Sequence, residues 1–165
     1  MTKQEMDDVM RKVQTWLTEE GIYRDKIPDD KANYHYKIEF PQGSSRFADV
    51  VQPKPRDDLI LIISGVSLGK EHYEGLKSKS KNERDNILWD MRFDLLFRNS
   101  DFNMLPNLDD LKQIQFIRPL HFEGLTKNVL MDAIREDYKC HLYIVWKMQR
   151  LFGAAPPKSP ETMYG

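Results

Sequence analysis

The sequence feature that most constrains the fold is a short aliphatic run near the middle of the chain. Leu59 to Ile63 are consecutive leucines and isoleucines, and Val66 extends the run. The run is too short to cross a bilayer, and after a turn-forming segment it is typical of a buried central strand. A strand that is apolar at successive positions needs cover on both faces, whereas a strand with one wet face alternates. The sequence therefore predicts cover on both sides, or helices on one face and a partner on the other.

Composition limits the number of domains and the classes of partner. With 40% hydrophobic residues in 165, the chain can bury one core, so we expect a single domain over residues 1–153 and a disordered proline-rich tail over 154–165. The charges, although abundant, sum to −1, which disfavours sequence-independent nucleic-acid binding. The first seventeen residues are partly acidic and lack a signal-peptide core, which predicts a cytoplasmic protein without a membrane anchor. Cys140 is the only cysteine, so no internal disulfide and no cysteine-rich metal site are expected.

Capping residues and apolar spacing predict the helices. Thr2 with Glu5, and Ser80 with Glu83, have the spacing of a capping box, and each pair precedes apolar residues at helical intervals. Thr126 is placed to cap a last helix. The predicted helices cover residues 2–20, 80–98 and 127–152, with a shorter one over 70–77 that Gly75 should weaken.

Alternation and turn residues predict five strands. Residues 34–40 alternate between apolar and polar, and residues 46–52 follow after a turn. The central run comes next, and residues 103–105 and 113–122 supply two more strands. We predict an α+β two-layer sandwich in the order α-β(3)-α-β(2)-α, with a five-stranded antiparallel sheet and helices on one face.

Two helices are apolar on two sides, which predicts an interface. Within residues 80–98 one stripe contains Leu88, Met91 and Leu95, and a second contains larger residues. The last helix has a thinner second stripe on its back. A small monomer cannot leave such surfaces exposed without a large apolar patch. The residues we expect to bind a partner, with a second copy as the first candidate, are Trp89, Phe93, Leu96, Phe97, Ile144 and Leu151.

The candidates for chemistry are dispersed along the chain. The four histidines, His35, His72, His121 and His141, show no metal-binding spacing, so no metal or other cofactor is expected. Cys140 and His141 are adjacent on a helix and point about 100° apart, which disfavours direct activation of the thiol. Residues 64–69 lack the spacing of a phosphate loop, and their two glycines are expected to release the chain from the sheet. A basic cluster, Lys77 to Arg84, has no aromatic platform and is expected to be a solvated loop.

Two stretches carry a resemblance to a known family. Ser80 to Arg84, leading to Ile87–Phe93 and Leu95–Leu96, and later Phe122–Lys127 look like an uncharacterised prokaryotic, largely archaeal, protein family. The order of elements resembles the type III secretion chaperone-like fold. The resemblance implies a five-stranded antiparallel sheet with helices on one face, and a homodimer that commonly uses the middle helix. It implies no catalytic activity.

Two hypotheses of different classes follow. The first is a non-catalytic, dimeric, chaperone-like module that buries the doubled stripes against its twin and holds a protein or peptide client on its remaining surface. The second is a small-ligand-binding or enzymatic domain with a pocket between sheet and helices, using Tyr34, Tyr36, Arg118 or His121. An enclosed polar pocket near those residues would favour the second hypothesis.

Overall fold

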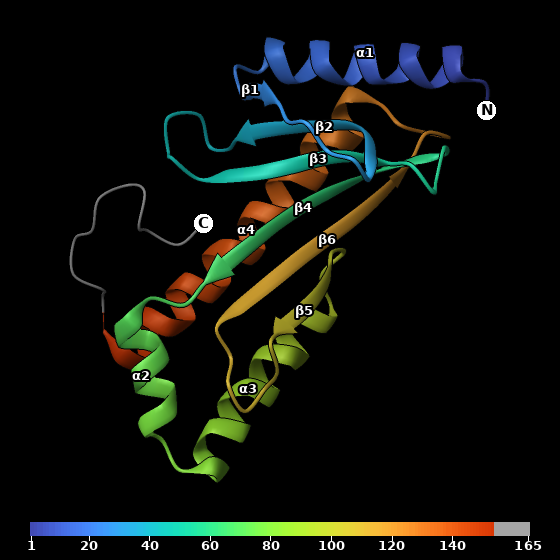
Figure 1. The fold of residues 1–165 in the computed structure, drawn as a ribbon. Helices are drawn as coiled ribbons and strands as arrows, with labels where there is room; N and C mark the ends of the chain where they lie inside the picture. Colours follow the sequence, from blue (N-terminus) through green and yellow to red (C-terminus); the bar gives the residue numbers. More distant parts are fainter. Residues whose placement is uncertain (154–165) are drawn as a thin grey trace.

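The computed structural model describes residues 1–153 as an α+β fold with four helices and one sheet (Figure 1). The expected disordered tail, 154–165, lies outside the described residues. In chain order the elements are α1 (Lys3–Glu19), β1 (Tyr23–Lys26), β2 (Ala32–Glu39), β3 (Phe47–Pro53), β4 (Leu59–Ser67), α2 (Lys70–Ser78), α3 (Lys81–Leu96), β5 (Asp101–Leu105), β6 (Gln113–His121) and α4 (Lys127–Phe152).

The sheet is antiparallel and has the strand order β1-β2-β3-β4-β6-β5. The aliphatic run therefore lies on an interior strand, β4, as predicted. The prediction of five strands is wrong, because β1 is a sixth strand at the edge beside β2. Three of its four residues are exposed and charged, so it has no apolar alternation that would mark it in the sequence. The observed order is α-β(4)-α-α-β(2)-α.

The register of β4 and β6 divides the side chains of the sheet between two faces. Ile60 lies opposite Leu120, and Val66 lies opposite Ile114; all four are buried. The helices pack on this face, and in Figure 1 α4 passes behind β2 and β3 and then runs beside β4. The other face, here called the open face, receives no helix from residues 1–153. Its apolar centre consists of Val51, Leu59, Leu61, Ile63 and Ile117.

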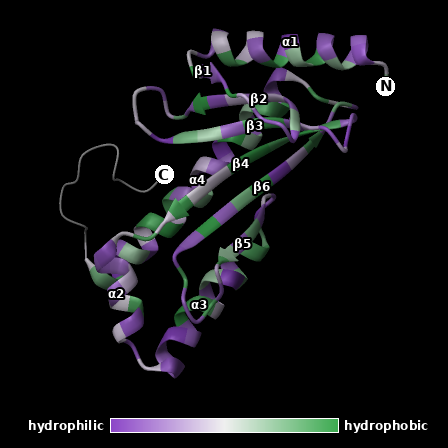
Figure 2. Cartoon of the chain, in the orientation of Figure 1, coloured by the Kyte–Doolittle hydropathy of each residue, from purple (hydrophilic) through white to green (hydrophobic). Residues whose placement is uncertain are grey.

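The buried apolar side chains form two clusters along the helix-covered face. The first joins α1, strands β2 to β4 and the N-terminal half of α4, and the second joins α2, α3, β6 and the C-terminal half of α4. Hydrophobic residues along β4 and β6 run between them (Figure 2). Because α4 contributes to both clusters, its position fixes how α3 lies on the sheet.

Gly75 serves the packing of α2 against α4. A Cβ atom at this position would lie 2.6 Å from Cδ1 of Phe152, so only glycine leaves room for that ring. The prediction that Gly75 weakens the short helix stays a prediction, and the same glycine allows close contact between α2 and the end of α4.

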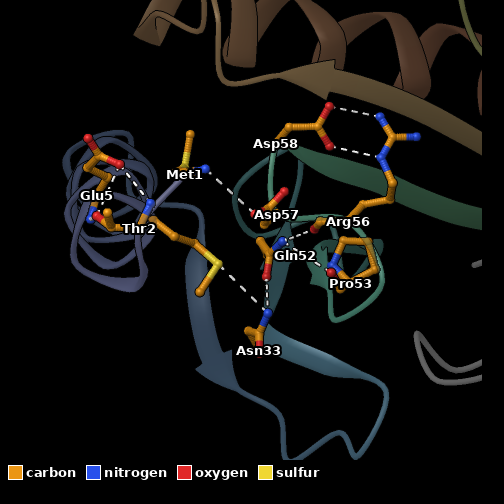
Figure 3. A network of polar contacts seen from close by, with 10 residues as sticks. Met1, Thr2, Glu5, Asn33, Gln52, Pro53, Arg56, Asp57 and Asp58 are labelled. Atoms are coloured by element: carbon orange, nitrogen blue, oxygen red, sulfur yellow. Dashed lines mark hydrogen bonds and ion pairs between the residues drawn. The ribbon is translucent and has the colours of Figure 1, made fainter.

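A polar network closes the turn between β3 and β4 (Figure 3). The fully buried Gln52 accepts a hydrogen bond of 2.7 Å from Asn33 Nδ2 and donates to the carbonyl oxygens of Pro53 and Arg56. Arg56 also forms a two-point ion pair with Asp58, and this hydrogen bonding lowers the pKa of Asp58 to about 2. The turn is therefore held by its own side chains, which sets where β4 begins.

A buried ion pair connects α4 to the sheet between the two clusters. Arg46 Nη2 lies 2.5 Å from Asp137 Oδ2, and Ser64 Oγ donates a hydrogen bond of 2.6 Å to the other oxygen. Both charged side chains are almost completely buried. Burial raises the pKa of Asp137, whereas Arg46 and Ser64 oppose that shift. The pair joins residues far apart in the sequence and holds α4 in register with β3 and β4.

Replacing Asp137 by alanine should lower the free energy of unfolding by about 3–5 kcal/mol, because it leaves the Arg46 charge buried without a partner. Urea denaturation followed by circular dichroism measures the change. Asp132→Ala, on the exposed side of the same helix, is the control and should change stability by no more than about 0.5 kcal/mol. Equal stability of the two variants would contradict a structural role for the ion pair.

Candidate functional site

Helix α3 carries the most exposed cluster of large apolar residues in the described chain. It begins with the predicted capping box: Glu83 N donates to Ser80 Oγ at 3.2 Å, and Ser80 N donates to Glu83 Oε2 at 3.1 Å. These bonds satisfy backbone donors that a helix N-terminus leaves free. The start of the helix, and therefore the direction of every later side chain on it, is fixed locally.

The C-terminal end of α3 is bound to α4 by polar contacts. Glu136 accepts hydrogen bonds from Asn99 N at 3.1 Å and from Ser100 Oγ at 2.5 Å. Tyr143 OH donates to Asp94 Oδ2 at 2.5 Å. These contacts prevent α3 from rotating about its axis, so its two stripes keep fixed directions.

The two stripes of α3 have different environments. Leu88, Met91 and Leu95 are buried in the second cluster. The other stripe, here called the α3 patch, lies outside the core of a single copy. Its members and exposed fractions are Trp89 (48%), Phe93 (55%), Leu96 (64%) and Phe97 (86%). These side chains have no place in the core of a single copy.

The α3 patch has a defined geometry at its centre. The rings of Trp89 and Phe93 lie 5.7 Å apart with an interplanar angle of 35°. The Arg92 guanidinium lies 4.3 Å from the Trp89 ring centroid, a distance at which a cation is attracted to an aromatic face. Exposed aromatic residues with a neighbouring arginine are the residue types enriched in protein interfaces.

Two further residues expected at an interface, Ile144 and Leu151, lie on α4 and are less exposed than the α3 patch. Ile144 is fully buried in the second cluster, so it offers no surface to a partner. Its assignment to the interface has to be withdrawn, because it packs in the second cluster with side chains from α2, α3 and β6. Leu151 is exposed on the last turn of α4, where its neighbour Phe152 packs against α2.

Trp146 is a large exposed side chain that the apolar stripes do not include. It is 63% exposed on α4, on the side of the helix that carries the exposed Lys139 and Arg150. Helical periodicity alone assigns this side to the polar surface. The only signal in the sequence is the presence of a tryptophan where a polar residue is expected.

The residues proposed for a ligand pocket are not brought together. Tyr36 is buried beneath α1, and its hydroxyl lies 3.4 Å from the Met10 carbonyl oxygen. Tyr34 donates to Asp7 at 2.7 Å. Arg118 points to the helix-covered face of β6, whereas His121 is exposed and pairs with Asp58. The four side chains therefore do not converge on one site.

Cys140 and His141 have separate surroundings, as their spacing predicts. Burial, with Glu136 close by, raises the pKa of the Cys140 thiol to about 12. Burial also lowers the pKa of His141 to about 4, and its ring stacks on Tyr138. A thiol that resists ionisation beside a neutral imidazole is unsuited to nucleophilic attack.

His35 lies between two carboxylates on the open face. Its Nδ1 is 2.9 Å from Asp29 Oδ2, and its Nε2 is 2.7 Å from Asp49 Oδ1. Burial lowers the pKa of His35, but hydrogen bonds to Asp49 and Asp29 outweigh that effect and leave the pKa above its ordinary value. The two carboxylates bind opposite sides of the ring, and within residues 1–153 no three acidic, histidine or cysteine side chains converge to hold a metal ion.

The structure differs from two predictions about loops, one for the glycines of residues 64–69 and one for the basic cluster. Gly65 does not release the chain from the sheet, because β4 continues to Ser67. A Cβ atom at Gly65 would lie 2.5 Å from the Gln113 side chain, which lies across the open face at this point. The basic cluster is not a loop either, because Lys77 lies in the last turn of α2 and Lys81 and Arg84 lie in the first turn of α3. Lys77 pairs with Asp110 at 3.5 Å, and Lys81 pairs with Asp85 at 2.8 Å.

Sheet, helices and exposed aromatic residues together define an α+β protein with an open sheet face and an uncovered helical surface. The chain belongs to the family described as "Uncharacterized conserved protein (DUF2299)", whose model matches residues 9–148. The structure is similar to the crystal structure of an uncharacterized protein from Methanothermobacter thermautotrophicus, with 30% sequence identity and a TM-score of 0.83. The similarity covers 88% of this chain and 99% of the other. The curated proteins contain no match.

These findings confirm part of the sequence-based resemblance. The chain is a member of an uncharacterised family, and one structural neighbour is archaeal. The chaperone-like relationship and the homodimer stay predictions. Among the helices of residues 1–153, none combines the length and apolar composition that a membrane crossing requires.

Truncating the α3 patch should cost little stability within one copy. Phe93→Ala should change the unfolding free energy of a single copy by no more than about 0.5 kcal/mol. Leu95→Ala, the matched buried variant two residues away, should cost about 2–5 kcal/mol. Urea denaturation at the lowest measurable protein concentration isolates the single-copy effect. A loss of several kcal/mol for Phe93→Ala under these conditions would place its ring in a core.

The environment of His35 predicts a pH-dependent stability. Because its folded pKa is raised, the protonated ring contributes stability that is complete below about pH 6.5 and is lost as the pH rises through the folded-state pKa. The difference in unfolding free energy between wild type and His35→Gln should therefore shrink from pH 5.5 to pH 8.5, in a window of about 3 pH units. A difference independent of pH would exclude the two-carboxylate environment.

Proposed function

We propose that this protein is a non-catalytic, chaperone-like binding module that forms a homodimer through the α3 patch. The observation that carries the proposal is the exposure of four large apolar side chains on a helix whose opposite stripe is already buried. The fold of a single copy leaves between 48% and 86% of each of these side chains exposed, and they are Trp89, Phe93, Leu96 and Phe97. Burying them against a second copy would remove their surface from water, the main favourable term in association.

The polar environment of the α3 patch supports association through this surface. Asp90 and Asp94 lie beside the patch, and Asp94 is already engaged by Tyr143. Arg92 covers one face of Trp89 and leaves the rest of that ring uncovered. An apolar centre with charges at its margin is the usual arrangement of a protein interface.

The open face is the surface we assign to a client. Leu61, Ile63 and Ile117 are only partly buried there, and residues 1–153 supply no helix to cover them. His35 and Asp49 border this apolar centre on β2 and β3. A protein or peptide segment with apolar side chains fits such a surface better than a small charged metabolite does.

Phe93→Asp should separate the dimer without unfolding either copy, because a charge at the centre of the α3 patch would lose its hydration on association. At micromolar concentration, sedimentation equilibrium should give twice the 19.5 kDa chain mass for wild type and the single mass for the variant. Circular dichroism should give the same spectrum for both proteins.

Trp146→Asp is the matched control, since Trp146 is an equally exposed aromatic residue on a different helix. This variant should remain dimeric. A wild-type protein that sediments as a monomer would overturn the proposal. Dissociation by Trp146→Asp together with persistence of the dimer in Phe93→Asp would move the interface away from α3.

A further inference from the structure

Strand β5 leaves one edge of the sheet without a neighbour in residues 1–153. It pairs with β6 on one side and stands last in the strand order. The Leu105 carbonyl oxygen accepts a hydrogen bond of 2.8 Å from Lys112 N, so it points toward β6. Backbone groups alternate in direction along an antiparallel strand, so those of Phe102 and Met104 point toward the free edge. An edge of this kind is a template for another strand.

The free edge of β5 adjoins the α3 patch. Arg92, Phe102, Asn103, Met104, Asn107 and Leu108 line a cleft of ≈ 420 Å³ between α3 and the edge. Arg92 belongs to both surfaces, because its guanidinium also lies over Trp89. Figure 1 shows α3 running along the β5 edge of the sheet. Whatever binds the edge therefore also approaches the α3 patch.

We propose that the second copy binds by adding its own β5 to this edge, antiparallel and about a two-fold axis at Asn103. This inference rests on the proposed homodimer and specifies its geometry. The two sheets become continuous through β5, and the two α3 helices face each other across the same axis. One symmetry operation then covers both the free backbone groups and the α3 patch.

The sequence of β5 is self-complementary in this arrangement. Asp101 of one copy lies opposite Leu105 of the other, Phe102 lies opposite Met104, and Asn103 lies opposite itself. No two like charges face each other, and thioether sulfur packs favourably against an aromatic ring. Phe102 and Met104 are on the helix-covered face, as partners of Phe116 and Ile114. Asn103 is on the open face, where its amide can bond to the same amide of the twin.

The opposite edge of the sheet is protected against such pairing. Strand β1 has only four residues, and its register with β2 shifts between Tyr23 and Asp25. Arg24, Asp25 and Lys26 place a charge at each following position. Short length, an irregular register and charged residues are the features by which edge strands avoid association. Strand β5 has a regular register and only one charge, so the two edges of this sheet are not equivalent.

Cysteine cross-linking tests this register. Asn103→Cys should form a disulfide between copies under mild oxidation, because directly opposed residues of a non-hydrogen-bonded pair have Cα atoms about 4.5 Å apart. Asp101→Cys alone and Leu105→Cys alone should not cross-link, since each would be about 13 Å from its counterpart. A mixture of these two variants, one of them tagged, should give the mixed disulfide. The native Cys140 is buried and is not expected to compete.

Asp25→Cys, on the opposite edge, is the control for random collision. Cross-linking at position 103 should exceed it by on the order of tenfold, because a preformed pair holds its thiols at a high effective concentration. Adding Phe93→Asp to Asn103→Cys should remove that excess. Cross-linking that survives this addition would separate the edge from the α3 patch and overturn the inference.

The outcomes distinguish this inference from the proposed function. If wild type is a dimer that Phe93→Asp dissociates, but Asn103→Cys cross-links no faster than Asp25→Cys, the dimer exists with another geometry and only the β5 pairing is wrong. If wild type is a monomer and Asn103→Cys does not cross-link, both are wrong. Cross-linking of Leu105→Cys alone would indicate a shifted register and would also overturn the pairing at Asn103.

Discussion

A sheet can bury only the side of a helix that faces it, and this limit governs the functional surface of the protein. Helix α3 has apolar residues on two opposite sides, and the second cluster accepts Leu88, Met91 and Leu95. The α3 patch is left in water, although α3 is fixed at both ends by its capping box and by Glu136. A fixed helix cannot turn its second stripe inward. The remaining ways to cover that stripe lie outside residues 1–153 of one copy.

Helix α4 has a similar double stripe but a different outcome, and the difference lies in its neighbours. Cys140 and Ile144 on its thinner stripe are buried in the second cluster, where α2, α3 and β6 surround the C-terminal half of α4. Helix α3 is the outermost helix, next to the edge strand β5, and has no such neighbour. The middle of the second stripe is therefore core in α4, whereas the second stripe of α3 is surface. Position in the sheet, which depends on strand order, decides between them.

The sequence correctly predicts features that depend on residues close together in the chain. The capping boxes at Thr2 and Ser80, the interior strand at Leu59 to Ile63 and the outward direction of Trp89 follow from spacing within one element. The features it missed depend on contacts across the fold. Strand β1 lacks an apolar pattern, the burial of Ile144 requires the position of α3, and the Asp137 to Arg46 ion pair joins residues 91 positions apart. No periodic pattern in the sequence predicts an ion pair between residues so far apart.

Because α4 is continuous across both apolar clusters, it affects how the protein unfolds. This single helix of 26 residues supplies side chains to both apolar clusters, and Asp137 anchors it near their junction. Half of such a helix, released from one cluster, would be only marginally stable in water. The two clusters should therefore melt together in one cooperative transition. Amide protons around the middle of α4 should be among the slowest in the chain to exchange with solvent.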